Sequence, residues 1–151
     1  MTEAKLERHR WSGDSGQALI ETAVTVSLFT LLLLGVAEFG RLAFAAIEVS
    51  NAASAGARYA AQSGAAADTT GIVNAAANDA SNLAGLTTTS SYSCICSDGS
   101  SSTCSNSDCS TSHIEETVTV NTQVSFDPLV HVPGLPKTFT LKGQAVEKCL
   151  H

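Results

Sequence analysis

A run of uncharged, mostly apolar residues stands near the N-terminus, from Thr22 to Ala37, between Glu21 and Glu38. Three further apolar residues lie directly on the other side of Glu21, and no proline interrupts the stretch. The hydrocarbon core of a bilayer is crossed by about 20 helical residues. The pattern therefore predicts a transmembrane helix at about residues 17–37.

The balance of residues indicates that this helix inserts into lipid. Eleven residues from Leu19 to Val36 are Leu, Ile, Val or Phe, and together they favour insertion by roughly 3–7 kcal/mol. Glu21 opposes insertion by about 3 kcal/mol at most, and by less near a helix end. A charge that weakens an anchor in this way is a candidate for a functional role.

Beyond the apolar run, small and apolar residues continue at steps of three and four, which is the seam of a heptad pattern. The predicted seam consists of Phe39, Leu42, Ala46, Val49, Ala53, Gly56 and Ala60. It indicates one long helix over residues 17–63, with Gly64 as its C-cap. The seam docks on the chain's own domain, on neighbouring subunits, or on both.

Residues 64–151 predict a small domain of mixed structure. A second helix is expected near Gly71–Ala84, capped by Thr69 or Thr70. One side of that helix is apolar: Ile72, Val73, Ala76, Ala80 and Leu83. The Thr- and Ser-rich stretch Thr87–Cys94 favours a strand.

Two alternating stretches near the C-terminus predict an antiparallel hairpin. The first runs from Glu116 to Phe126 and the second from Lys137 to Lys148, and the loop between them contains all three prolines of the chain. The apolar faces comprise Val118, Val120, Thr122, Val124 and Phe126, and then Phe139, Leu141 and Ala145. The fold class is therefore α+β: a leader (1–16), a long transmembrane and amphipathic helix (17–63), and a small domain with a short helix and an antiparallel hairpin or small sheet.

Four of the five cysteines lie close together in and before a serine-rich loop: Cys94, Cys96, Cys104 and Cys109. Disulfides in an oxidising compartment are the first interpretation. Neighbours in C-x-C rarely bond to each other, so the pairing is 94–109 with 96–104, or 94–104 with 96–109. A four-thiolate zinc site is the alternative, although the usual C-x-x-C spacing is absent. Cys149 is the odd thiol, either free or replacing one of the four.

Charge and residue types exclude several function classes. The net charge of −6 argues against nucleic-acid binding, which needs a basic patch. No two of His9, His113, His131 and His151 have metal-ligand spacing, and Glu115 and Glu116 point to opposite faces of a strand. Without a phosphate loop or a nucleophile motif, the sequence indicates neither an enzyme nor a cofactor, metal or small-molecule substrate.

Three blocks of sequence resemble a known family. Gly16 is followed five residues later by Glu21, which resembles a prepilin cleavage site. Glu38-Phe39-Gly40-Arg41, with the three residues before it, looks like a membrane-exit motif, and the Ala-rich stretch at residues 51–58 follows in order. Together they are similar to the TadE-like family, minor pseudopilins of the tight-adherence (Flp, type IVc) pilus system.

The resemblance implies that a membrane prepilin peptidase cuts after Gly16 and leaves Gln17 as the N-terminus. It also implies that the mature protein enters or primes a pilus-like assembly, with other pseudopilins or pilins and the inner-membrane machinery as partners. Glu21 could pair there with a neighbour's N-terminal ammonium, so that both charges leave lipid compensated. The alternative is that Glu21 lies among the headgroups near the cytoplasmic face. Glu38 and Arg41 are expected to be interface anchors rather than functional groups.

Basic residues predict the orientation of the chain. Three of them precede the apolar run, whereas Arg41 alone lies within the fifteen residues after it. The N-terminus is therefore expected on the cytoplasmic side of the inner (cytoplasmic) membrane, and the C-terminal domain on the outer side. Two alternatives remain: an uncleaved single-pass protein, and a secreted binding module released by signal peptidase at Ala43-Phe44-Ala45.

Overall fold

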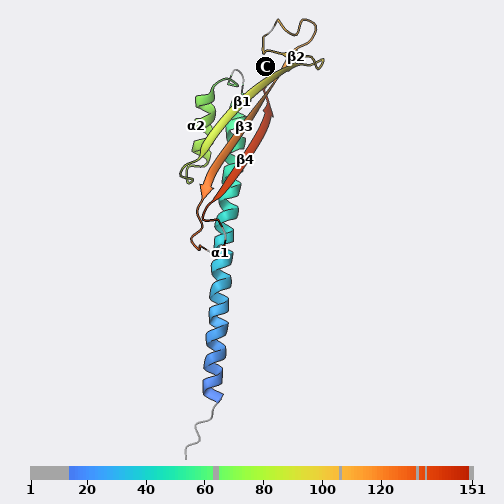
Figure 1. Ribbon diagram of the computed structural model, residues 1–151. Helices are drawn as coiled ribbons and strands as arrows, with labels where there is room; N and C mark the ends of the chain where they lie inside the picture. The colour runs from blue at the N-terminus through green and yellow to red at the C-terminus, as the bar shows by residue number, and fades with distance from the viewer. Residues whose placement is uncertain (1–13, 63–64, 106, 132, 135, 150–151) are drawn as a thin grey trace, which may run out of the picture. The chain divides into compact units, whose positions relative to one another are not determined.

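The computed structural model describes residues 14–62, 65–105, 107–131, 133–134 and 136–149 (Figure 1). Its elements are α1 (Asp14–Ala60), α2 (Thr69–Asp79), β1 (Thr87–Cys96), β2 (Ser101–Ser102), β3 (Ile114–Phe126) and β4 (Phe139–Lys148). The predicted α+β class with a long N-terminal helix is confirmed. The chain divides into two units, residues 1–37 and 38–151, and α1 contributes to both.

In the first unit, the described residues form a helix whose side chains from Gly16 to Ala37 are all exposed. The helix begins at Asp14, three residues before the predicted start, and the predicted leader otherwise lies outside the described residues. Three hydroxyls in this apolar stretch bond to the carbonyl four residues earlier: Thr22 to Ala18, Ser27 to Ala23 and Thr30 to Val26, at 2.7–2.8 Å. Each hydroxyl proton is thereby satisfied within the helix, as a lipid environment requires.

The second unit contains an antiparallel sheet of order β2-β1-β3-β4. β3 lies in the centre and pairs with β1 from Thr87↔Gln123 to Cys96↔Ile114. On its other side β3 pairs with β4 down to Phe126↔Phe139, which confirms the predicted hairpin. β2 was not predicted, because it is a two-residue strand within a serine-rich loop and carries no periodic signal.

One face of the sheet packs on the C-terminal part of α1. Val118, Val120, Thr122, Val124 and Phe126 are all buried, as their alternation predicts. The facing helix residues are mostly small: Val49, Ala53, Gly56, Ala57 and Ala60. Ala52 packs instead with Ala76 and Ala80 of α2. Small side chains allow the backbones to approach closely, and the Thr122 hydroxyl donates to the Val49 carbonyl at 2.7 Å.

The predicted seam is buried against the chain's own domain from Val49 onward, whereas Phe39 and Ala46 are exposed. Successive residues turn by about 100° in an α-helix, so Ala46 points roughly 60° and Phe39 roughly 80° away from Val49. Leu42 and Ala45 lie closer to the Val49 direction and are partly or fully buried. The seam therefore serves, at least from Val49, to dock the chain's own domain.

The second helix differs from its prediction at both ends. Its N-cap is Asp68, whose carboxylate accepts from the Gly71 N–H at 2.9 Å, rather than either threonine. It ends at Asp79, five residues early, because Asn and Asp favour caps and turns over helix interiors. Ile72, Ala76 and Ala80 are buried as predicted, whereas Val73 is 39% exposed. The predicted cap of α1, Gly64, lies outside the described residues.

Candidate functional site

The three residues of the predicted cleavage and assembly site lie in the first unit. Gly16, Gln17 and Glu21 are all exposed on the first two turns of α1. Among the described residues, apart from its two chain neighbours and the local helix backbone, no heavy atom lies within 4 Å of the position that a Cβ on Gly16 would take. The first N–H groups of a helix lack intrahelical partners, so this end of α1 is held by fewer backbone bonds than its middle.

The second predicted motif, Glu38-Phe39-Gly40-Arg41, binds the chain just after β3. Arg41 Nη1 donates to both carboxylate oxygens of Glu38 at 3.1 Å. The same carboxylate accepts the backbone N–H of Leu129 at 3.0 Å. The Arg41 guanidinium also lies 5.4 Å from the ring centroid of Phe126, which is buried. We call this group, Glu38 and Arg41 with Phe126 and Leu129, the clasp.

Each contact in the clasp is modest, because the side chains remain partly in water. An exposed cation–π contact contributes about 0.5–1 kcal/mol, and an exposed helical ion pair about 0.3–0.5 kcal/mol. Their common effect is positional: they fix the end of the β3–β4 hairpin to one turn of α1. Phe39 and Gly40 take no part and lie exposed on the helix.

Further contacts show that β3 runs antiparallel to α1. Its residues meet the helix in reverse order: Val120 at Gly56, Thr122 at Val49, and Phe126 at Arg41. The β3–β4 connection consequently lies at the Glu38 end of the second unit. The loop between β1 and β3, which carries the cysteines, lies at the opposite end of the sheet (Figure 1).

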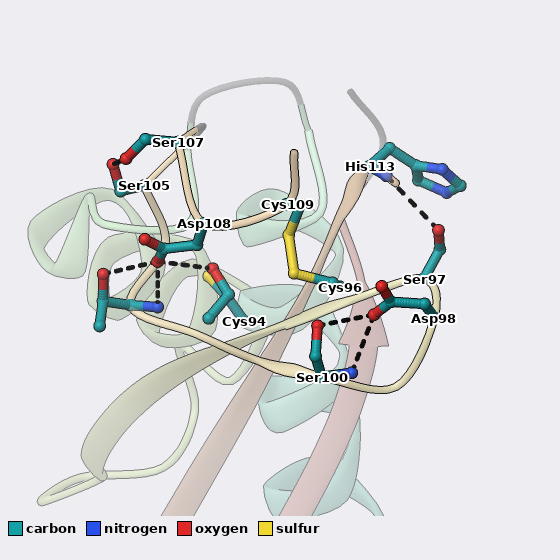
Figure 2. The surroundings of a disulfide bond; sticks show 12 residues. Cys94, Cys96, Ser97, Asp98, Ser100, Ser105, Ser107, Asp108, Cys109 and His113 are labelled. Atoms are coloured by element: carbon teal, nitrogen blue, oxygen red, sulfur yellow. Dashed lines mark hydrogen bonds between the residues drawn. A yellow bond between two sulfur atoms is a disulfide. The ribbon is translucent and has the colours of Figure 1, made fainter. Parts of the chain in front are cut away.

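The cysteine loop holds two disulfides, Cys94–Cys104 and Cys96–Cys109, with Cα–Cα distances of 5.2 and 5.6 Å. This is one of the two pairings that the sequence left open. Figure 2 shows the second disulfide, Cys96–Cys109. Cys149 is free and half-buried, with its Sγ 3.5 Å from the Ala60 carbonyl. Burial, and then the nearby Glu116 charge, raise the pKa of the Cys149 thiol.

Two aspartates organise the same loop through short polar contacts (Figure 2). Asp108 accepts from both the N–H and the hydroxyl of Thr103, at 2.6 and 2.7 Å. Asp98 accepts from the N–H and hydroxyl of Ser100, at 3.0 and 2.6 Å. These side-chain and backbone bonds lower the pKa of both carboxyls. An Asp among Ser and Thr residues is the sequence signal that would predict such a hydrogen-bonded loop.

The outer face of the sheet is polar and slightly hollowed. An open hollow of about 470 Å³ is lined by Thr87, Thr89, Asn121, Thr122, Gln123, Lys142, Gly143 and Gln144. Its side chains are amides, hydroxyls and one ammonium. They include neither a carboxylate pair nor a nucleophile with a base, so the hollow offers no acid–base or nucleophilic chemistry.

An apolar helix of this length at the N-terminus, continuous with an α+β domain, fits a single-pass membrane protein. The model of the family described as TadE-like protein matches residues 16–58. The match contains all three blocks of motifs named above. The TadE-like family is a structural family associated with tight-adherence pili, so the match indicates a pilus-associated protein. No curated protein and no solved structure matches the chain.

The matched segment ends two residues before α1 does and includes no part of the sheet. It does include every helix residue of the clasp and most of the small residues on which the sheet packs. In this chain the matched segment therefore has two parts: an exposed apolar part in the first unit, and a part in the second unit on which the sheet docks.

Proposed function

We propose that the protein is a minor pseudopilin that takes part in the assembly of a tight-adherence pilus or secretion apparatus. The observation that carries the proposal is the match over residues 16–58, together with the position of its motifs on the single helix α1. The protein acts as a structural subunit, and its partners are other pilins or pseudopilins, the inner-membrane machinery and the prepilin peptidase.

In this proposal the mature protein begins at Gln17 and waits in the cytoplasmic membrane with its domain outside. Glu21 weakens the anchor by up to about 3 kcal/mol, which lowers the cost of extracting the helix from lipid. In the assembly, Glu21 pairs with the N-terminal ammonium of a neighbour. In a low-dielectric bundle, the attraction between the two charges offsets the cost of removing them from water only if they meet in good geometry.

Exposed apolar side chains on α1 support a contact with neighbouring subunits. The helix displays leucines and valines throughout the first unit, and Phe39, Phe44 and Ile47 continue this surface into the second. Phe44 and Ile47 face away from the strip that docks the sheet, and Phe39 lies to its side, so the same helix can hold its own domain and contact another subunit. Bundled helices satisfy this geometry.

The N-terminus of the mature protein tests the proposal. The full chain would be expressed with and without the prepilin peptidase of a tight-adherence system, and the membrane-bound product would be measured by intact mass and N-terminal sequencing. We expect Gln17 only when the peptidase is present. A chain that still begins at Met1 with an active peptidase would point to an uncleaved single-pass protein.

A secreted binding module is the second candidate, and it predicts a new N-terminus near Ala46. The polar disulfide loop favours it, because such a loop suits an outer surface. The clasp argues against it, since a cut after Ala45 would separate Glu38 and Arg41 from the chain that they hold. Ala45 itself is buried, so that cut would also divide the docked helix.

A further inference from the structure

Two large apolar side chains stand exposed in the connection that follows β3. Leu129 is 73% and Val130 is 48% exposed. Beside them, His131 Nε2 lies 3.3 Å from Asp127 Oδ1, so the charge of that carboxylate has a partner when the imidazole is protonated. The described part of this connection thus presents two neighbouring apolar side chains to solvent.

The clasp fixes the position of this pair along the chain's helix. The Leu129 N–H donates to Glu38, and Glu38 is the first charged residue after the apolar run. If that run spans a bilayer, Glu38 lies where the span leaves the hydrocarbon. The polar interface there is about 5–8 Å thick on each side, which is comparable to the reach of one side chain.

We propose that Leu129 and Val130 form a second membrane contact, inserting into the lipid headgroup and acyl boundary beside the exit of α1. The inference rests on the proposed function, because it needs residues 17–37 to span the membrane. Continuity with the span favours lipid over a neighbouring subunit as the partner of this pair. Apolar side chains at this depth leave water for lipid.

The contact gives the clasp a function beyond stability. Glu38 and Arg41 hold the hairpin end at the level of the membrane surface, so one helix turn positions both the anchor's exit and the lipid-binding pair. The second unit then has two attachments to the membrane, and subunit extraction must release both.

Depth-dependent fluorescence quenching tests the proposal on the full chain. Trp11 is the only tryptophan, so a Trp11→Phe background allows single probes. The probes are Leu129→Trp and Val130→Trp, and the control is Val146→Trp, on the outer face of the sheet with 56% exposure. Each variant is reconstituted in phosphatidylcholine and phosphatidylglycerol vesicles that contain lipids brominated at shallow or deep acyl positions.

We expect a blue-shifted emission at positions 129 and 130 and several-fold greater quenching by shallow bromines than at position 146. Equal quenching at the three positions would overturn the inference. A blue shift without quenching by any brominated lipid would place the pair against protein and would overturn it as well.

A probe inside the apolar run separates this inference from the proposed function. Phe29→Trp, in the same background, should be quenched by deep bromines if the run spans the bilayer. Quenching at position 29 without quenching at 129 and 130 contradicts the second contact alone. Absence of quenching at position 29 contradicts the span, and with it the pseudopilin proposal.

Discussion

Gly143→Ala should destabilise the second unit, because β4 lies close against the backbone of α1 at Gly143. A Cβ on this residue would lie 2.5 Å from the Val49 carbonyl oxygen and 2.9 Å from the Ser50 Cα. It would also lie 2.7 Å from the Thr122 hydroxyl oxygen. Two of the three atoms are helix backbone and cannot rotate away, so the strand or the helix must shift.

Overpacking of this kind typically costs about 1–3 kcal/mol. The backbone contacts with α1 place Gly143→Ala in the upper part of that range, at about 2–3 kcal/mol. The shift should also weaken the bond from the Thr122 hydroxyl to the Val49 carbonyl. Removing that hydroxyl as well, with Thr122→Ala, should not restore stability, since the helix backbone still blocks the new methyl group.

The assay is urea unfolding of the full, oxidised chain in detergent micelles, followed by circular dichroism. With an m-value near 2 kcal/mol/M, a loss of about 2 kcal/mol lowers the midpoint by about 1 M. Lys142→Ala is the matched control, one residue away on the exposed face. Equal midpoints for the two variants, or full rescue by Thr122→Ala, would refute the close contact of strand and helix backbone.

Four other predictions concern maturation, thiols, pH and assembly. Gly16→Ser should block cleavage, so the mutant precursor should keep the gel mobility of uncut wild type when the peptidase is present. Thiol titration of denatured but unreduced protein should find one free thiol, Cys149. Reduction should lower the unfolding midpoint, because disulfides that close loops of 10 and 13 residues each stabilise the fold by roughly 3 kcal/mol in the chain-entropy model. Hydrogen bonds from the Gly71 N–H, first, and from the Tyr59 hydroxyl lower the pKa of Asp68 in the folded protein. The Asp68 carboxylate therefore stabilises the folded state fully above its unfolded-state pKa of about 4, and this stabilisation is lost as pH falls through the lower folded-state pKa. The wild-type unfolding midpoint should accordingly fall more steeply below about pH 4 than that of Asp68→Asn. Glu21→Gln should leave membrane levels and cleavage normal but abolish pull-down with other pilus subunits, since breaking a buried pair costs about 3–5 kcal/mol; normal co-purification would contradict an assembly role.

Local periodicity was sufficient to predict most elements of the fold. β3 and β4 alternate cleanly because one face of each packs on a helix and the other faces water. The long helix was equally clear, since no proline and few strong breakers interrupt residues 14–60. Short elements fared worse: β2 has two residues, and the N-cap of α2 fell to Asp68 in a segment that offers three adjacent capping residues.

Long-range partners could not be predicted from the sequence. The motif at Glu38 and Arg41 was readable, but its partner Leu129 lies 91 residues away. The cysteine spacing likewise allowed two pairings, and only the twist and register of β1 against β2 place Cys94 beside Cys104. In both cases the local sequence shows a side chain that needs a partner, a carboxylate or a thiol, and the pairing of the strands determines which distant residue becomes that partner.

The extent of the family match has a physical explanation in these contacts. From residue 38 onward, the matched part of the helix contributes a carboxylate and a guanidinium to the clasp, and then a strip of mostly small residues that ends at Ala57. The sheet needs only an alternating apolar face and a free N–H after its central strand to dock there. Many sequences satisfy that requirement, whereas the helix must meet it while also presenting apolar residues elsewhere on its surface. The helix is therefore the more constrained partner. The disulfide loop lies at the far end of the sheet from Glu38 and outside the matched segment, and its two disulfides and aspartate hydrogen bonds hold it without the helix motifs.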